Sequence, residues 1–206
     1  MINKKILNHL EKTNLKHEVI PHKKVYTAYD ASQTLKVPPK QIVKSLIIKV
    51  KNDFALILLS ADKNVDFKKL AKQFKVLEKD IKVPNEKVLI AKLKINPGTA
   101  HVFGTLYNIP VVIEKGLSDM KEAIFSSGSF TESLKIKVSD FVKHQEANVI
   151  NFGIAKKFKK AKKILKKAIK PTKKQNKKVI SKKLNSKKLK SKKTIKKIVP
   201  KKKTKK

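Results

Sequence analysis

The sequence predicts a mixed α+β domain over residues 1–150, followed by a lysine-rich, low-complexity basic tail over residues 151–206. Strand-like and helical stretches are interleaved without a regular βαβ repeat, which favours an α+β fold. A hydrophobic fraction of 40% is enough to bury a core in a chain of this length. The charge is unevenly divided, because residues 156–206 hold 27 of the 53 lysines and none of the 15 acidic residues.

The first part of the chain is predicted to form a helix, a strand and a second helix. Apolar residues recur at helical spacing over residues 3–13, and residues 17–20 alternate as a short strand. Thr27 and Asp30 have the spacing of a capping box, which predicts that a short helix begins there. Pro38-Pro39 then stops this helix, because proline disfavours helical backbone in the residue before it.

A hairpin is predicted at the centre of the domain. Residues 44–50 and 54–59 are strand-like, and a short polar turn separates them. Both runs are almost continuously apolar, so we expect the sheet to be covered on both faces. Lys44 stands at the head of the first run, where the sheet begins, and is the lysine that we single out as functional.

The remaining elements continue the irregular order. The sequence predicts a helix over 66–74, a helix near 85–90, a glycine-containing loop over 96–104, strands over 110–114 and 134–138, and a last helix capped by Ser139 or Asp140. Tyr26, Tyr29 and Phe125 are expected to lie in the core rather than to stack on bases.

Composition excludes several classes of function. With no cysteine, the chain has no disulfide, thiol nucleophile or cysteine-ligated metal. The histidines lack metal-ligand spacing, and we predict neither a metal site nor a cofactor. No stretch approaches the roughly 18 apolar residues of a membrane span, so a cytoplasmic protein without such a span is expected. A net charge of +38 favours polyanionic partners, nucleic acid first.

Four motifs occur in a characteristic order along the globular part. They are Thr27-Ala28-x-Asp30-Ala31, Val43-Lys44-Ser45-Leu46, Gly98-x3-Val102-Phe103-Gly104 and Ser127-Gly128-Ser129. In order and spacing they resemble the YbaK family, which is also called the prolyl-tRNA synthetase-associated editing domain family. The resemblance covers about residues 5–145.

The resemblance implies a fold, an activity and a set of residues. It implies a compact mixed β-sheet, partly barrel-like and flanked by helices, that hydrolyses the ester joining a wrong amino acid to the 3′-terminal adenosine of a tRNA. The family analogy points to tRNA(Pro) carrying Ala or Cys. It assigns the catalytic role to Lys44. It assigns substrate binding to Gly98, Thr99, Ala100, His101, Val102, Gly104, Gly128 and Ser129.

Several of these residues also have simpler interpretations. Val102 stands where the family's GxxxP loop has proline, which puts the shape of the amino acid pocket in question. His101 either faces the substrate or is solvated at the surface, and Gly128-Ser129 is either part of the site or a plain hairpin turn. A nonenzymatic nucleic-acid-binding protein that keeps an editing-like fold is the alternative function.

The tail is expected to act by charge. Apolar residues recur at helical spacing over 158–169, and lysine pairs in low-complexity sequence follow. Each lysine that neutralises a phosphate releases a counterion, so binding should be salt-dependent and carry no base-reading code. We expect a nonspecific RNA tether, with a solvated tail as the alternative. The expected partners are the aminoacylated 3′ end of tRNA, ribosomal RNA or other nucleic acid, and an aminoacyl-tRNA synthetase.

Overall fold

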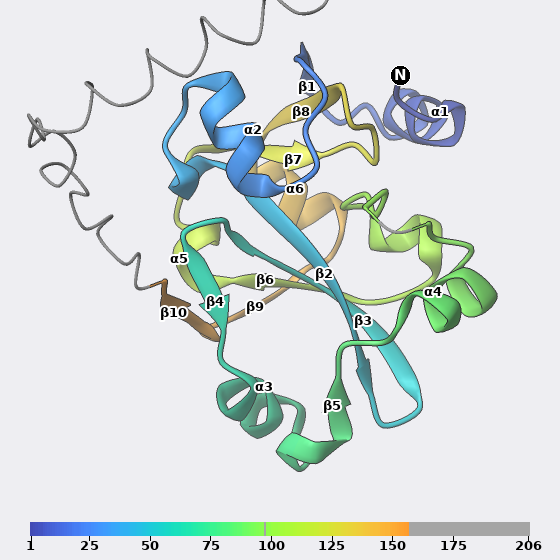
Figure 1. The fold of residues 1–206 in the computed structure, drawn as a ribbon, viewed down its shortest axis with the longest axis vertical. Coiled ribbons are helices and arrows are strands. Elements are labelled where there is room, and N and C mark those ends of the chain that lie inside the picture. Colours follow the sequence, from blue (N-terminus) through green and yellow to red (C-terminus); the bar gives the residue numbers. More distant parts are fainter. Residues whose placement is uncertain (97, 157–206) are drawn as a thin grey trace, which may run out of the picture. The chain divides into compact units, whose positions relative to one another are not determined.

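The computed structural model describes residues 1–96 and 98–156, and within them it confirms the mixed α+β fold (Figure 1). The helices are α1 (Lys4–Thr13), α2 (Ala28–Leu35), α3 (Phe67–Phe74), α4 (Glu86–Leu93), α5 (Lys115–Ser118) and α6 (Val138–His144). The strands are β1 (His17–Pro21), β2 (Val43–Val50), β3 (Asp53–Ser60), β4 (Lys63–Val65), β5 (Ile81–Lys82), β6 (Val111–Glu114), β7 (Glu122–Ser126), β8 (Glu132–Lys137), β9 (Asn148–Ile150) and β10 (Gly153–Ala155).

Three sheets organise these strands. The largest has the order β5-β2-β3-β6-β9, antiparallel from β5 to β3 and parallel from β3 to β9. A second sheet, β1-β8-β7, is antiparallel, and β10 pairs with β4. Each sheet is open within the described residues, so the barrel-like part of the expectation is not confirmed. A bridge between Ile42 and Ile124 brings the start of β2 beside β7.

The β2–β3 hairpin runs through the middle of the domain and is buried on both faces, as predicted (Figure 1). Leu56 and Leu58 face one apolar cluster, whereas Ile57 and Leu59 face another, and all four side chains are fully buried. Successive strand residues point to opposite faces, which is why one continuous apolar run serves two cores. Burying each such side chain stabilises the fold by roughly 1.5 to 3 kcal/mol.

The two predicted helix caps have different outcomes. At α2 the capping box is confirmed: the Asp30 amide donates to Thr27 Oγ1, and the Thr27 amide donates to Asp30 Oδ2, both at 3.1 Å. At α6 the prediction is wrong, because the N-cap is Lys137 and no side chain caps it. Strand β8 passes directly into α6, so Ser139 and Asp140 fall inside the first helical turn.

The short strands β4, β5, β9 and β10 were not predicted, because each is too short to show a sequence period. Strand β10 pairs with β4, and the side chain of Phe152 is fully buried, so residues 151–155 pack on the domain. The amphipathic segment predicted over 158–169 lies outside the described residues.

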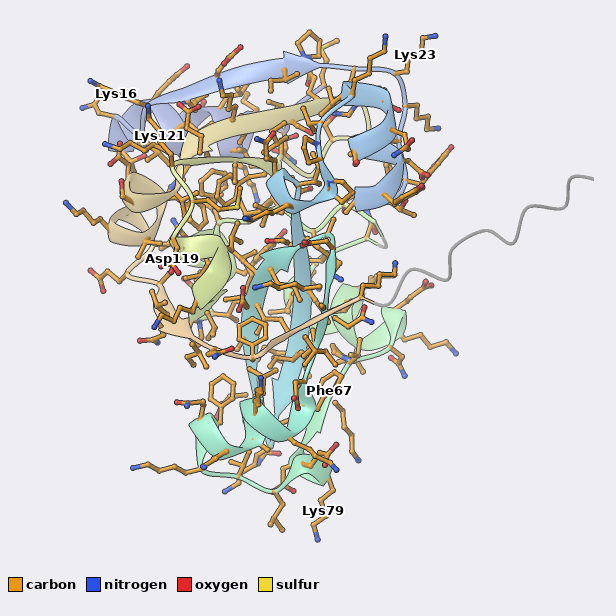
Figure 2. All side chains as sticks on the ribbon, turned by 90° about the vertical axis from the view of Figure 1, so that its left-hand side faces the viewer. Lys16, Lys23, Phe67, Lys79, Asp119 and Lys121 are labelled. Atoms are coloured by element: carbon orange, nitrogen blue, oxygen red, sulfur yellow. The ribbon has the colours of Figure 1, made fainter. Side chains whose placement is uncertain are left out.

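Lysines cover much of the described surface. The side chains of Lys16, Lys23, Lys79 and Lys121 project outward from it (Figure 2). No helix in the described part of the chain is both long enough and apolar enough to cross a membrane.

Candidate functional site

A pocket of about 360 Å³ lies where the start of β2 meets the loop before residue 101 and the turn between β7 and β8. Its volume falls at the small end of the range for ligand pockets, roughly 300 to 1,000 Å³. Its polar and aromatic lining residues are Tyr26, Thr27, Lys44, Ser45, Phe125, Ser126, Ser129, Phe130 and Ser133, and its other residues include Gly98, Ala100, Ala28, Ala31, Ile42 and Ile124. The pocket therefore contains residues from each of the motifs that the sequence singled out.

Lys44 lines this pocket and is half-buried, so its side chain does not point into bulk solvent. Its ammonium donates to the carbonyl oxygen of Lys63 at 2.7 Å. Burial lowers the pKa of Lys44, the charge of Lys156 lowers it further, and Asp62 opposes the shift. A lysine has three donors, and the bond to Lys63 uses one of them.

The residue whose carbonyl Lys44 contacts, Lys63, also forms an ion pair with a buried carboxylate, which the sequence did not reveal. Lys63 Nζ lies 2.6 Å from Glu114 Oε2, and Glu114 is only 2% exposed. Two glycines close over this pair: a Cβ on Gly116 would lie 2.4 Å from Lys63 Nζ, and one on Gly153 would lie 2.8 Å from Lys63 Cδ. The sequence signal was an acid at the end of an apolar strand, Glu114, whose partner comes from a distant segment.

Two hydroxyl groups hold the loop over residues 98–101, which borders the pocket. Ser45 Oγ on β2 and Ser126 Oγ at the end of β7 both donate to the carbonyl oxygen of Ala100, at 3.1 and 3.3 Å. Gly98 has a φ of +76°, and a Cβ there would lie 3.1 Å from a ring carbon of Phe130. Glycine thus permits both the left-handed backbone and the close approach of the aromatic ring.

The Gly128-Ser129 turn also packs against this loop. Gly128 has a φ of +77°, and a Cβ there would lie 2.9 Å from the carbonyl oxygen of Thr99. Ser129 lines the pocket, and its hydroxyl lies 3.2 Å from Thr131 Oγ1. The Gly128 amide donates to Ser126 Oγ at 3.3 Å. The segment is therefore both a hairpin turn and a wall of the pocket.

Residues 22–144 match the aminoacyl-tRNA editing domain family, and this range contains the whole pocket. The chain belongs to the aminoacyl-tRNA editing domain family. Membership supports an editing role for the domain and agrees with the resemblance found in its motifs. No curated protein matches the sequence significantly.

Solved structures share the fold of this editing domain. A crystal structure of a hypothetical protein matches with a TM-score of 0.67 at 16% identity, over 73% of this chain and 100% of that one. A candidate trans-editing enzyme for prolyl-tRNA synthetase matches with a TM-score of 0.64 at 17% identity, over 75% and 100%. A scaffold protein for computational epitope grafting matches with a TM-score of 0.64 at 20% identity, over 74% and 97%. At these identities the likeness concerns the fold alone.

The second half of the predicted substrate loop turns into the core of the editing domain. Val102 is fully buried in the apolar cluster, and Gly104 is buried where a Cβ would lie 2.4 Å from Val111 Cγ2 and 2.6 Å from the carbonyl oxygen of Ile109. Neither residue lines the pocket. Of the predicted site residues, the structure gathers Lys44, Gly98, Ala100 and Ser129 in the lining of the pocket, whereas Thr99, His101, Val102, Gly104 and Gly128 are not among its lining residues.

His101 packs on Tyr107 beside the loop that borders the pocket. It is half-buried, and its ring stacks on Tyr107 with centroids 4.0 Å apart and planes 7° apart. The His101 amide donates to the Tyr107 hydroxyl at 3.0 Å, and the Phe103 amide donates to His101 Nδ1 at 3.3 Å. Burial lowers the pKa of His101 to about 4, with a further contribution from His9. Burial also raises the pKa of Tyr107 to about 12. At neutral pH this pair is uncharged.

Two of the three aromatic residues expected in the core are exposed instead. Phe125 is fully buried, as predicted, but Tyr26 is 66% exposed and Tyr29 is 51% exposed. Tyr26 precedes the N-cap residue of α2, so its side chain lies at the rim of the pocket rather than on the buried face of a helix. The sequence could not predict this exposure, because a single aromatic residue that precedes a helix cap does not belong to a periodic apolar pattern.

Proposed function

We propose that this protein is a trans-editing aminoacyl-tRNA deacylase, which hydrolyses the ester of a mischarged tRNA, with tRNA(Pro) carrying Ala or Cys as the first candidate. The observation that carries the proposal is the pocket that joins Lys44, the Gly98–Ala100 loop and Ser129 within an editing domain. The fold shared with a candidate trans-editing enzyme for prolyl-tRNA synthetase supports the choice of tRNA.

Hydrolysis of an aminoacyl ester requires only modest catalysis by the protein. Water attacks the carbonyl carbon of the ester, the bond from that carbon to the ribose oxygen breaks, and the ribose oxygen leaves with a proton. The products are a free amino acid and a tRNA with a free terminal hydroxyl. Because the ester is already activated, positioning of the substrate and stabilisation of the developing oxyanion are the main requirements. A ribose hydroxyl of the tRNA can assist in activating the water.

Lys44 and the loop supply the groups for this chemistry. The Lys44 ammonium keeps donors beyond the one used on Lys63, and as a compact point charge it suits a phosphate or carbonyl oxygen. The amides of Thr99 and His101 are bonded within the described protein, so those of Gly98 and Ala100 are the loop donors for a ligand. The carbonyl of Ala100 accepts hydrogen bonds from two hydroxyl groups, and these bonds hold the loop that carries the amides of Gly98 and Ala100.

The apolar end of the pocket favours a small amino acid. The side chains of Ala28, Ala31, Ile42 and Ile124 line the pocket and belong to one apolar cluster. Such a surface accepts the methyl group of alanine or the thiol of cysteine without leaving a polar group unpaired. A charged side chain would lose its hydration against the same wall.

The basic tail serves in this proposal as a nonspecific RNA tether. The described chain ends at Lys156, whose amide donates to the carbonyl oxygen of Asp62 at 2.8 Å and whose charge acts on Lys44. A tail that binds RNA through its lysines can raise the local concentration of RNA around the editing domain. Replacing the tail lysines after Lys156 by glutamine should weaken RNA binding and flatten its salt dependence, while the rate on saturating substrate stays close to that of the wild type.

One observation favours the alternative, a nonenzymatic nucleic-acid-binding protein. The Lys44 ammonium is already bonded to Lys63, and a purely structural lysine would look the same. A panel of mischarged tRNAs separates the two functions, with the full-length protein and its Lys44→Ala variant assayed in parallel. Hydrolysis of at least one mischarged tRNA that Lys44→Ala abolishes supports the deacylase. Salt-sensitive binding to RNA and DNA without hydrolysis of any tRNA supports the alternative.

A further inference from the structure

Two aromatic rings and one lysine form a group at the rim of the pocket. The rings of Tyr26 and Phe130 have centroids 5.4 Å apart with an interplanar angle of 51°. Lys24 Nζ lies 5.1 Å from the Tyr26 centroid and 5.9 Å from the Phe130 centroid. Both aromatic residues line the pocket, and Tyr26 is 66% exposed. The exposed Tyr26 ring and the half-buried Phe130 ring thus lie at the pocket, and the Lys24 ammonium lies over both.

This arrangement is set by the backbone. The Val25 amide donates to the carbonyl oxygen of Phe130 at 2.9 Å, and the His22 amide donates to that of Thr131 at 2.8 Å. These bonds hold the segment after β1 alongside the turn before β8. On the pocket side, Phe130 meets the loop at Gly98, where a Cβ would come within 3.1 Å of the ring. These contacts hold the two backbone segments together and place the Phe130 ring against the loop at Gly98.

The rim differs from the interior in what it can bind. Inside, alanine and isoleucine side chains face a small space suited to an amino acid side chain. At the rim, an exposed tyrosine, a half-buried phenylalanine and an ammonium that lies over both rings are groups that proteins use to hold an unpaired base and the phosphate beside it. The terminal nucleotide of a tRNA brings such a base and such a phosphate, directly attached to the ester.

We propose that Tyr26 and Phe130 form a stacking platform for the terminal adenine of the tRNA 3′ end, with Lys24 meeting the phosphate of that nucleotide. The inference rests on the proposed function in one respect, which is that the 3′ end enters this pocket. Tyr26 and Phe130 act as positioning residues: they fix the nucleotide, and the ester is thereby placed against Lys44 and the Gly98–Ala100 loop.

Fluorescence of 2-aminopurine tests the platform without any need for hydrolysis. The probe is an RNA hairpin that ends in CCA with 2-aminopurine in place of the terminal adenine, titrated with the full-length protein at raised salt to suppress tail binding. Stacking quenches this fluorophore, and the protein has no tryptophan to interfere. A hairpin with 2-aminopurine inside the stem is the control for binding elsewhere.

The expected result is quenching at the terminal position that depends on the two rings. Tyr26→Leu and Phe130→Leu keep apolar bulk but remove a ring, and each should reduce the affinity for the terminal probe by about tenfold. Tyr26→Phe keeps the ring and should restore the quenching. Tyr29→Leu is the matched control, because Tyr29 is also exposed but does not line the pocket, and it should behave like the wild type.

Deacylation kinetics give the second measurement. With a hydrolysable mischarged tRNA, Tyr26→Leu should raise KM by about tenfold and change kcat much less, because Lys44 and the loop remain in place. Unchanged quenching in both leucine variants would overturn the platform, even if the wild type proves to be an active deacylase. Ring-dependent quenching by a protein that hydrolyses no mischarged tRNA would uphold the platform and reject the proposed function.

Discussion

Lys44 and Ser45 are neighbours on β2, but their side chains serve opposite sides of the strand. Lys44 donates to the carbonyl of Lys63 on β4, and the Lys63 side chain forms an ion pair with the buried carboxylate of Glu114. Ser45 donates to the carbonyl of Ala100, which also accepts from Ser126, and the next residue, His101, stacks on Tyr107. One side of the pocket is thus supported by charge and the other by neutral groups. The two sides should therefore lose stability under different conditions, one when a charge partner is removed and the other when the pH falls.

The largest expected change in the free energy of unfolding comes from breaking the ion pair between Lys63 and Glu114. Lys63→Met leaves Glu114 buried without its partner, which should lower the free energy of unfolding by about 3 to 5 kcal/mol. The double variant Lys63→Met/Glu114→Leu removes both charges and should recover much of that loss. Urea unfolding of the full-length proteins measures both, with Lys79→Met, an exposed lysine, as the control. A loss below about 1 kcal/mol in Lys63→Met would show that the pair does not anchor β4.

The loop side of the pocket, which is held by neutral groups, should lose stability in acid. The folded pKa of His101 is about 4, below its ordinary 6.5, so the unfolded chain binds a proton more readily between these values. The stability from neutral His101 is therefore complete above pH 6.5 and is lost as the pH falls toward 4, a change of roughly 2 to 3 kcal/mol. Burial lowers the pKa values of His9 and His144 as well, which adds loss in the same direction.

Unfolding free energies measured from pH 7 to pH 4 check this expectation. His101→Gln cannot gain the charge, so its stability should be lower at pH 7 but should fall less steeply in acid. If the slopes of the two proteins coincide, His101 is not a buried neutral residue, and the distinction between a charged and a neutral side of β2 fails.

A smaller effect is expected at the loop clamp. Ser45→Ala removes one of the two hydroxyls that donate to Ala100 and should lower the free energy of unfolding by about 1 kcal/mol. Because the remaining hydroxyl of Ser126 holds the loop less firmly, KM for a mischarged tRNA should rise more than kcat falls. Ser139→Ala, at an exposed serine of α6, is the control for both measurements. Equal behaviour of the two variants would remove Ser45 from the support of the site.

The parts that could be predicted from the sequence are those fixed by local pattern. The two faces of the β2–β3 hairpin follow from its continuous apolar runs, and the start of α2 follows from Thr27 and Asp30. The motif order also located Lys44, Gly98, Ala100 and Ser129, which the structure places in one pocket.

What the sequence could not show depends on distant segments meeting. Lys63 and Glu114 are far apart in the chain, and only the approach of β4 to β6 makes them partners. His101 lies in a loop, but burial lowers its pKa and the charge of His9 lowers it further, while its ring stacks on Tyr107 from a later segment. Tyr26 was assigned to the core because an aromatic residue usually lies there, whereas the chain turns at Thr27 and leaves it at the rim.

The central claim is that Lys44 provides chemistry whereas the tail provides affinity. The most direct test is the single-turnover hydrolysis of a mischarged tRNA at saturating protein, measured beside the affinity of the same protein for that tRNA. Lys44→Ala should slow hydrolysis by at least about 100-fold, since it removes the charged donor from the pocket, and should leave the affinity almost unchanged. A Lys44→Ala protein that hydrolyses at the wild-type rate, or that loses affinity in proportion to rate, would contradict the account.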